Sequence, residues 1–467
     1  MFELSRHSPK PLVDQIVEQL SGLIREGRLA EGTRLPSIRK LAGLSGASPF
    51  TVVDAYDRLV ARGLIASRAG SGFYVAARAP TAGLAAIEAI GNPGSAAVAL
   101  AYAALTQPAH AIAAGSGFLP TQWLMEIAPG TAAMRLARGR RPEAFMPCPP
   151  QGLPELREQL AAKLLRAGIV AAPANLLVTF GASHAFDLIA RALLAPGDAV
   201  LVEDPGYFVL FEQLRAHHVR LVPIPRLPDG PDLEALETAC RAHRPRAFFL
   251  QTLLHNPSGS SIEPAHCHRL LSLAERYGVA VIEDDVYGDL YEGAGVRLAQ
   301  IDGLRHVIHV GSFSKLIGPA LRVGFIAAER ALIGQLVQRK MLTVLSGSAL
   351  LESFIVEVLD GGRYGRHVEQ IRVRLARMRR DARAALAAAG IGFDEERGGG
   401  MFLWGRVPDG TDADQLVQRA REASILLAKG SLFSASGGCR ERLRFNAAHS
   451  TAPELASFLR GALKSTV

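Results

Sequence analysis

Two kinds of hydrophobic pattern divide the chain into two parts. Near the N-terminus, apolar residues recur at helical spacing, as at Leu12, Ile16, Leu20 and Ile24, which predicts one face of an amphipathic helix. Further along, short uninterrupted apolar runs alternate with helical sequence, which is typical of buried parallel strands. The pattern therefore predicts a small, mainly helical unit followed by a large α/β unit.

The small unit has the pattern of a winged helix-turn-helix. After the first helix, a short second helix precedes Ser48, a residue that favours the N-cap, and Pro49, which suits the first helical position. The third helix is expected to end at Gly63. Two short strands, Leu64–Ser67 and Phe73–Val75, follow with a glycine-containing turn between them. We expect the third helix to enter the DNA major groove.

In the large unit, each of five apolar runs ends in a polar cluster. The runs are Leu176–Phe180, Ala199–Glu203, Ala247–Thr252, Val279–Glu283 and Val307–Val310. The clusters that follow are Gly181-Ala182-Ser183, Asp204-Pro205-Gly206-Tyr207, His255-Asn256-Pro257-Ser258-Gly259, Asp284-Asp285-Val286-Tyr287 and Gly311-Ser312-Phe313-Ser314-Lys315. Because ligands bind outside the carboxyl ends of the strands in an open α/β sheet, we expect these clusters to form one site.

Part of this site suits a phosphate group. A phosphate dianion favours free N–H groups at a helix start, hydroxyl groups and a guanidinium. Ala182 and Ser183 offer the N–H groups, Ser312 and Ser314 the hydroxyls, and Arg322 the guanidinium.

The remaining clusters suit an aldehyde and a ring nitrogen. Lys315 can form a Schiff base with an aldehyde, and Asp284 can keep a pyridine nitrogen protonated, so that the ring acts as an electron sink. Asn256 and Tyr287 can bond a ring hydroxyl, and Tyr207 offers a face for stacking. Taken alone, Lys315 also fits a surface lysine, and Asp284 and Tyr287 also fit a helix cap and a core aromatic.

Two further features are open to more than one interpretation. Arg444, in a strand-like segment, can grip a carboxylate bidentately, but a strand arginine is also often an ion-pair partner. Two short groups, His266-Cys267-His268 and His217-His218, suggest metal ligands. Neighbours in sequence do not share a helix face, and no second cluster is spaced for zinc, so we expect no metal site.

Composition and charge narrow the class of protein. The 467 residues are 49% hydrophobic and 21% charged, enough to bury large cores. The formal charge is +8, and residues 1–78 carry eleven Arg and Lys against seven Asp and Glu, which fits a polyanionic partner. The four cysteines form no CxxC, so we expect reduced thiols in a cytoplasmic protein. We see no signal peptide and no apolar stretch long enough to span a membrane.

The stretch LPSIRKLAGLSGASPFTVVDAYDRLVARGLIASRAGSGFYV resembles the DNA-binding domain of GntR-type bacterial regulators. The resemblance implies DNA contacts from helix residues and from the wing. These are Arg39, Ser48 and Thr51 in the helices, and Arg68, Gly70 and Gly72 in the wing.

The segments SFSKLIGPALRVG, HNPSG and DDVYGDL resemble those of fold-type I aminotransferases, which bind pyridoxal 5'-phosphate (PLP). The resemblance implies that Lys315 is the Schiff-base lysine, Asp284 the pyridinium partner, and Arg444 the arginine for a substrate or effector carboxylate. It implies that Asn256 and Tyr287 bind the ring hydroxyl. The implied phosphate ligands are Ser312, Ser314 and Arg322.

A winged helix joined to an aminotransferase-like domain resembles the MocR branch of GntR-type regulators. We therefore predict a DNA-binding domain at 1–78, a linker at 79–108, and a PLP-binding effector and dimerisation domain at 109–467. The Ala-rich stretch at 79–108 is alternatively part of the second domain.

The resemblance implies a transcriptional regulator that senses an amine or amino acid through an aldimine at Lys315. It also implies a head-to-tail homodimer on a double-stranded DNA operator. The alternative is an active PLP-dependent aminotransferase with an appended DNA-binding domain.

Overall fold

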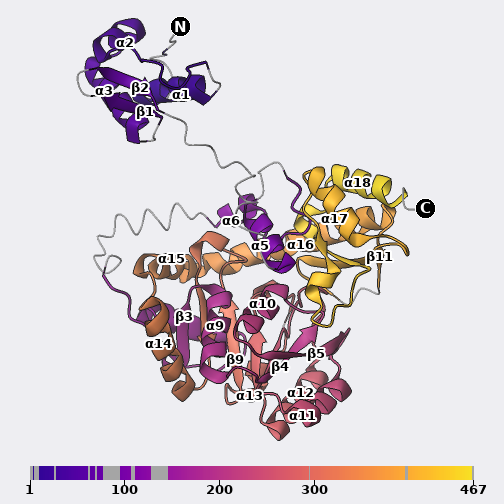
Figure 1. Cartoon of the computed structure of the whole chain (residues 1–467). Coiled ribbons are helices and arrows are strands. Elements are labelled where there is room, and N and C mark those ends of the chain that lie inside the picture. Colours follow the sequence, from indigo (N-terminus) through magenta and orange to yellow (C-terminus); the bar gives the residue numbers. More distant parts are fainter. Residues whose placement is uncertain are drawn as a thin grey trace. The chain divides into compact units, whose positions relative to one another are not determined.

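The computed structural model describes residues 4, 10–25, 28–61, 64–68, 71–76, 95–106, 111–127, 146–293, 295–394 and 398–464. The chain forms two compact units, Met1–Asn92 and Pro93–Val467, which Figure 1 shows in indigo and in purple to yellow. No helix among the described residues combines the length and the apolar character that crossing a membrane requires.

The N-terminal unit is a winged helix-turn-helix, as the sequence predicted. Three helices precede a two-stranded antiparallel hairpin, in which Ile65 pairs with Val75. The elements are α1 (Leu12–Arg25), α2 (Ile38–Ser45), α3 (Pro49–Ala61), β1 (Ile65–Arg68) and β2 (Gly72–Val75).

Tyr56 holds the centre of this unit together. Its side chain is fully buried among apolar residues of α1, α2 and α3, and its ring meets Phe73 edge-on at 4.7 Å between centroids. The hydroxyl donates a hydrogen bond to the carbonyl oxygen of Pro36 at 2.7 Å, and burial raises the pKa of Tyr56 to about 12. This contact ties α3 to the segment before α2, and thereby fixes how the two helices of the helix-turn-helix meet.

The second unit is built on an eight-stranded sheet whose strands are mostly parallel. Strand β10 runs antiparallel to its two neighbours, β3 and β9, and the short edge strand β6 runs antiparallel to β5. The strand order is β3 (Leu176–Thr179), β10 (Gly324–Ala327), β9 (Val307–Ser312), β8 (Ala280–Asp284), β7 (Ala247–Leu250), β4 (Ala199–Asp204), β5 (Arg220–Leu227) and β6 (Gly230–Pro231).

Helices pack on both faces of this sheet (Figure 1). Along β4, for example, Leu201 faces one core cluster, whereas Val200 and Val202 face the other. This burial on two faces explains the uninterrupted apolar runs in the sequence. The helices are α8 (Pro154–Arg166), α9 (Gly181–Leu193), α10 (Phe208–Ala216), α11 (Leu233–His243), α12 (Pro264–Tyr277), α13 (Leu298–Asp302), α14 (Arg330–Val344), α15 (Ala349–Leu359) and α16 (Arg363–Ala388).

The C-terminal part of this unit adds a smaller antiparallel sheet, on which α17 (Ala413–Glu422) and α18 (Pro453–Lys464) bury apolar side chains. Its strand order is β11 (Gly392–Phe393), β12 (Phe402–Arg406), β14 (Arg442–Asn446) and β13 (Ala428–Lys429). The segment at 111–127, which includes α6 (Thr121–Met125), runs beside β13, and the N–H of Gly115 bonds the carbonyl of Leu426.

One part of the predicted linker belongs to the second unit. Helix α5 (Ala96–Thr106) lies inside the stretch 79–108, and its Ala97 and Leu100 are buried against Phe208 and Phe433. Alanine side chains are short, so this helix packs closely on α10. Residues 96–106 therefore fit the alternative that this stretch is part of the second domain, and not the linker interpretation; residues 79–94 and 107–108 lie outside the described residues.

Candidate cofactor site and DNA-binding surface

The polar clusters meet at one edge of the large sheet, as the parallel strand order requires. Asp284 ends β8, and the segment that leads to Lys315 continues from β9. The loop that carries Asn256 follows β7, and Gly181 begins α9 directly after β3. Residues far apart in sequence thereby share the carboxyl ends of neighbouring strands.

Lys315 lies in a site that favours its neutral amine. The ammonium donates a hydrogen bond to the carbonyl oxygen of Gly117 at 2.9 Å and lies 4.7 Å from the ring centroid of Phe118. Loss of hydration, together with the nearby positive charge of Arg444, lowers the pKa of Lys315 to about 8. An amine that loses its proton near neutral pH is suited to attack a carbonyl carbon.

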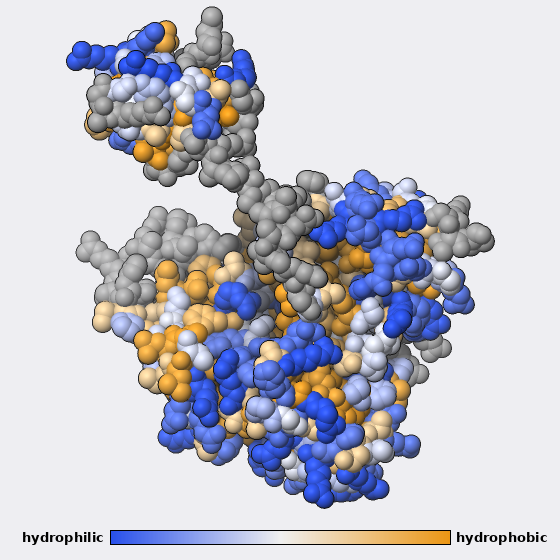
Figure 2. Space-filling view, in the orientation of Figure 1, coloured by the Kyte–Doolittle hydropathy of each residue, from blue (hydrophilic) through white to orange (hydrophobic). Residues whose placement is uncertain are grey.

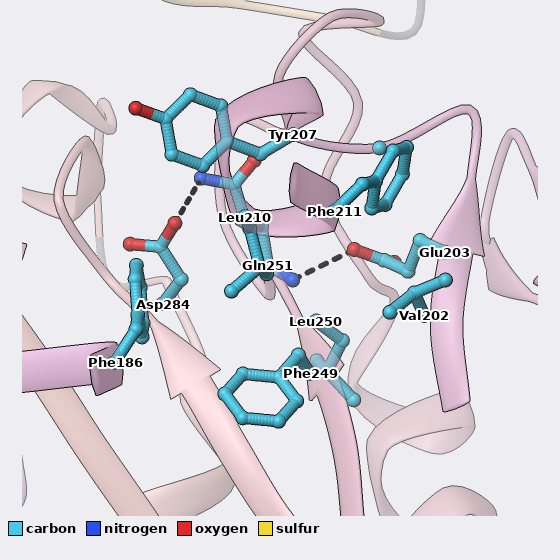
Figure 3. A pocket seen from close by; sticks show the side chains of 11 residues that line it. Phe186, Val202, Glu203, Tyr207, Leu210, Phe211, Phe249, Leu250, Gln251 and Asp284 are labelled. Carbon is cyan, nitrogen blue, oxygen red and sulfur yellow. Dashed lines mark hydrogen bonds between the residues drawn. The ribbon is translucent and has the colours of Figure 1, made fainter. Parts of the chain in front are cut away.

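Asp284 is a buried carboxyl group with neutral hydrogen-bond donors. Its Oδ2 accepts a hydrogen bond from Nε2 of Gln251 at 2.9 Å (Figure 3), and its Oδ1 accepts one from the N–H of Val286 at 3.2 Å. Burial raises the pKa of Asp284 to about 7. Such a group can hold a cationic ring N–H, because an added positive charge would offset the desolvation of the carboxylate.

Arg444 is buried beside Asn256, although the two are far apart in sequence. Its Nη1 donates to Oδ1 of Asn256 at 2.9 Å, and its Nη2 donates to the carbonyl of Gly115 at 2.6 Å. The guanidinium lies between the rings of Phe402 and Phe433, at 4.4 and 4.8 Å from their centroids, and burial lowers its pKa to about 10. Its Nε has no hydrogen-bond partner in the described part of the chain.

Tyr207 and Tyr287 complete the walls of the site. Tyr207, at the N-cap of α10, lines one pocket with Asp284 (Figure 3). Burial raises the pKa of Tyr207 to about 12, although the neighbouring Ser183 acts to lower it, and burial also raises the pKa of Tyr287. Tyr287 packs edge-on against Phe402, and its ring lies 5.5 Å from the Lys315 ammonium.

A cradle for an anion forms where α9 begins. A Cβ atom at Gly181 would lie 2.9 Å from Nη2 of Arg322, so glycine is required for the guanidinium to approach the helix start, where Ala182 and Ser183 follow. The same nitrogen donates to the carbonyl of Phe180 at 3.0 Å. A helix start beside an arginine is suited to a phosphate dianion.

Two serines lie at and just after the end of β9, on the far side of β10 from β3. Ser312, at the end of β9, pairs with Gly324 of β10, and a Cβ at Gly324 would lie 2.8 Å from Gly181. Ser312 Oγ accepts a hydrogen bond from the N–H of Ser314 at 3.2 Å. The buried Ser314 Oγ has no partner within the described ranges, which fits a hydroxyl that bonds an exogenous group.

Sequence reasoning missed three groups that shape the site: the Gln251 side chain, the Gly117 carbonyl and the Phe118 ring. Gln251 directly follows β7, so the same rule on strand ends would have found it. Gly117 and Phe118 lie in the segment before α6, and no local pattern links that segment to Lys315.

The histidines considered as metal ligands have structural roles. His266 bonds the carbonyl of Pro231 at 2.6 Å, and His217 bonds Asp187 at 2.8 Å. Within the described ranges, no group of three or more His, Cys, Asp or Glu side chains is placed to hold a metal ion. All four cysteines are free.

On the N-terminal unit, Ser48 caps α3. Its Oγ accepts a hydrogen bond from the N–H of Thr51 at 3.1 Å and bonds the Thr51 hydroxyl at 2.8 Å. Arg39 is exposed on α2, and Gly72 begins β2 with a φ of +105°. The Arg68 side chain and Gly70 lie outside the described residues, so their predicted DNA contacts remain predictions.

A winged helix-turn-helix joined to an aminotransferase fold defines a class of two-unit transcriptional regulators. Residues 12–75 match the family "Bacterial regulatory proteins, gntR family", and residues 131–461 match "Aminotransferase class I and II". The second family is PLP-dependent. The residues that surround Lys315 fit this cofactor, since the site offers an amine, a buried carboxyl and an unpartnered serine hydroxyl at an anion cradle.

Relatives match most of the chain. The HTH-type transcriptional regulator YdcR of Escherichia coli is 30% identical over 93% of this chain and 94% of its own. The probable rhizopine catabolism regulatory protein MocR of Rhizobium meliloti is 31% identical over 80% of this chain and 76% of its own. The crystal structure of LysN, an alpha-aminoadipate aminotransferase from Thermus thermophilus complexed with N-(5'-phosphopyridoxyl)-L-leucine, covers 81% of this chain and 97% of its own, with 27% identity and a TM-score of 0.73.

The chain belongs to the MocR-type branch of the GntR regulators, in which a winged helix is fused to a class I and II aminotransferase domain. It is a PLP-dependent DNA-binding transcriptional regulator.

Opposite charges around Lys315 should move its pKa in opposite directions. Replacing Arg444 by Met removes a positive charge and should raise the pKa of Lys315, whereas Asp284→Asn removes a negative charge and should lower it. We expect shifts of roughly half a pH unit or more, where one unit corresponds to about 1.4 kcal/mol. Competitive acetylation of the full-length protein without added cofactor, followed by mass spectrometry across pH, measures the shift, with the exposed Lys40 as reference. Shifts of the same sign in both variants would contradict this account.

Proposed function

We propose that the large unit senses an amine or amino acid through PLP attached at Lys315, and that this event changes the DNA affinity of the N-terminal unit. The observation that carries the proposal is the half-buried Lys315 close to two buried charged groups, Asp284 at the end of β8 and Arg444 on β14, whose charges act on its pKa. When bound, PLP supplies an aldehyde that combines reversibly with primary amines and a ring that withdraws electrons.

Each site residue has a role in this proposal. Lys315 attaches the cofactor, Asp284 accepts a hydrogen bond from the protonated ring nitrogen, and Tyr207 stacks on the ring. Asn256 and Tyr287 bond the ring hydroxyl. The phosphate is held by the helix start at Ala182 and Ser183, by Ser312 and Ser314, and by Arg322.

Arg444 makes the proposed site specific for effectors that carry a carboxylate. The guanidinium is oriented by Asn256 and Gly115 and held between two aromatic rings, so it is positioned before any ligand arrives. A positioned arginine fork binds a carboxylate with two hydrogen bonds. An amino acid therefore offers an amine for the cofactor at Lys315 and a carboxylate for Arg444, whereas a simple amine offers only the first group.

The proposal includes a homodimer in a head-to-tail arrangement. At the end of α14 and the start of α15, exposed apolar side chains gather, and Figure 2 shows apolar colour over these helices. Such a patch is typical of a surface that packs against another copy. Its residues are Met341, Leu342, Val344, Leu345 and Leu350. We place residues 1–78 on the operator DNA, and we propose a cytoplasmic location because that DNA is there.

Removing Lys315 should abolish sensing. In Lys315→Ala we expect no visible absorbance band on addition of PLP and no effect of amines on DNA binding, because no amine attaches the cofactor. Lys429→Ala, which changes an ion-paired lysine on β13, serves as the control and should behave as the wild type. Absorbance spectra and DNA-binding titrations with a panel of amino acids measure both properties. An effector response that survives in Lys315→Ala would refute the proposal, and steady keto-acid formation in the wild type would favour an aminotransferase.

Arg39 should contribute to DNA binding through a phosphate. We expect Arg39→Ala to weaken binding about tenfold and to reduce the salt dependence of the affinity by about one released ion. Arg58→Ala is the matched control, since Arg58 is already paired with Asp54 and Asp14. Fluorescence anisotropy at several salt concentrations, on a duplex selected from a random library, measures both. If the affinity of Arg39→Ala depended on salt concentration as steeply as that of the wild type, Arg39 would not contact a phosphate.

The apolar patch should control association. The wild type should sediment with twice the 49.8 kDa mass of one chain, and Leu342→Asp should sediment with the mass of one chain, because a carboxylate would be buried without a partner. Leu227→Asp, on β5 near the other edge of the sheet, is the control and should leave the mass unchanged. Dimers of undiminished stability in Leu342→Asp would place the interface elsewhere.

A further inference from the structure

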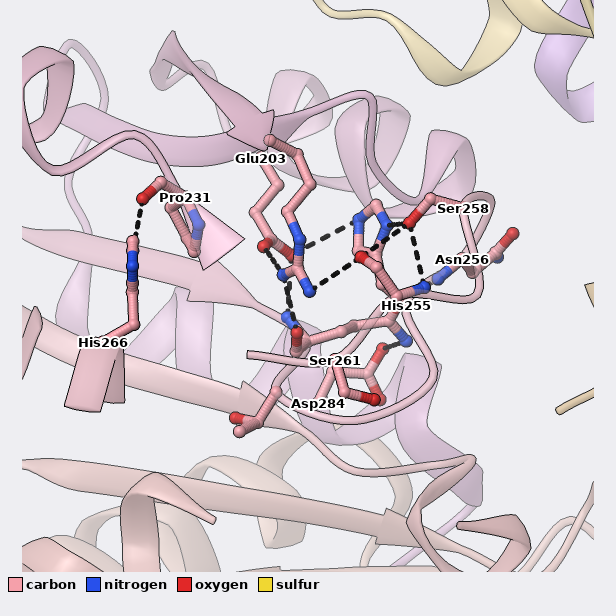
Figure 4. A network of polar contacts seen from close by, with 12 residues as sticks. Glu203, Pro231, His255, Asn256, Ser258, Ser261, His266 and Asp284 are labelled. Carbon is pink, nitrogen blue, oxygen red and sulfur yellow. Dashed lines mark hydrogen bonds and ion pairs between the residues drawn. The ribbon is translucent and has the colours of Figure 1, made fainter. Parts of the chain in front are cut away.

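Gln251 lies between two of the residues that face the proposed cofactor ring. Its side chain follows β7 and is buried, with 4% of the residue exposed. Its Nε2 donates a hydrogen bond to Oδ2 of Asp284 at 2.9 Å, and its Oε1 accepts one from the N–H of Asn256 at 2.7 Å. One amide group thus holds both residues (Figures 3 and 4).

The direction of this amide is fixed by its partners. The N–H of Asn256 can only donate, and the Asp284 carboxylate can only accept. If the amide were turned over, two donors would face each other at Asn256 and two acceptors would face each other at Asp284, all in a buried site. Gln251 therefore always presents N–H, and never C=O, to Asp284.

The backbone of Gln251 is held as firmly as its side chain. Its N–H donates to Oε2 of Glu203 at 2.8 Å, and its carbonyl accepts a hydrogen bond from Nη1 of Arg226 at 2.9 Å. Glu203 and Arg226 form a buried ion pair, which Figure 4 shows next to the loop with His255 and Ser258. In the described part of the chain, this ion pair forms no hydrogen bond with Asp284 itself, and Gln251 connects the two.

We propose that Gln251 is a positioning residue that keeps the Asp284 carboxylate ionised and oriented toward the cofactor ring nitrogen. This inference rests on the proposed cofactor site and goes beyond it, because Gln251 touches Asp284 rather than the ring. Its amide supplies a neutral donor, and a donor of this kind stabilises a carboxylate without neutralising the charge that the ring nitrogen needs.

The other groups around Asp284 act on its charge in both directions. Burial and the neighbouring Asp285 raise the pKa of Asp284, whereas Val286, Lys315 and Gln251 lower it. The charge of Asp284 also raises the pKa of the Tyr207 and Tyr287 hydroxyls. Without the Gln251 donor, the pKa of Asp284 would rise further, the carboxyl would take up a proton more readily, and the ring nitrogen would hold its own proton less strongly.

The test uses the full-length protein loaded with PLP labelled with 15N at the ring nitrogen. NMR reports whether this nitrogen is protonated, as a function of pH. In Gln251→Met and Gln251→Leu, both apolar and of similar size, we expect the midpoint of deprotonation to fall by about one pH unit or more. We also expect PLP to bind roughly tenfold more weakly, the effect of losing one hydrogen bond to a charged group.

Gln151→Met is the matched control. Nε2 of Gln151 donates to the carbonyl of Leu176 at 2.8 Å, at the end of β3 away from the site. This variant should keep the wild-type midpoint. The second Gln251 variant decides the outcome if the first does not fold.

Three outcomes are distinguishable. A wild type with no Lys315-dependent cofactor band would defeat the proposed function itself. A wild-type band with an unchanged midpoint in both Gln251 variants would overturn the inference alone, even if stability or affinity fell, because a merely structural role would not change ring protonation. A lower midpoint in both variants, with none in Gln151→Met, would support it.

Discussion

The parallel alignment of β4, β7, β8 and β9 is the constraint on which the site depends. Parallel strands bring their carboxyl ends to one edge, so each strand delivers the residue that follows it to the same place. Asp284, Asn256 and Lys315 come together for this reason and not because they are close in sequence. Burial on both faces keeps the strands in register and the positions of these residues fixed.

This arrangement places opposite charges in a site with little water. Burial raises the pKa of Asp284 to about 7 and lowers that of Lys315 to about 8, so both approach the pH at which they would exchange protons with a ligand. Arg444 adds a positive charge that is held by aromatic rings and carbonyl oxygens rather than by a carboxylate. A cofactor with a cationic ring and an anionic phosphate would supply the opposite charges that these buried groups lack.

The N-terminal unit depends on a separate core. Tyr56 closes that core, and Ser48 caps the helix expected to read DNA, without help from the large unit. A signal between the two units therefore requires an effector that binds two arrangements of the protein with different affinity. The proposed homodimer offers such arrangements, because two winged helices must match two half-sites on one operator.

Local pattern was sufficient to predict the winged helix and the five strand ends, because helical spacing and apolar runs depend on neighbouring residues. The short motifs at the strand ends also gave the candidate residues of the cofactor site, whose roles remain predictions. The tertiary structure alone decided which distant groups join them. Packing brought Arg444 to Asn256 and the Gly117 carbonyl to Lys315, and it moved α5 from the predicted linker into the large unit. It also aimed the Gln251 amide at Asp284. These contacts join segments that no periodicity connects, because their partners are chosen by chain topology and burial rather than by spacing.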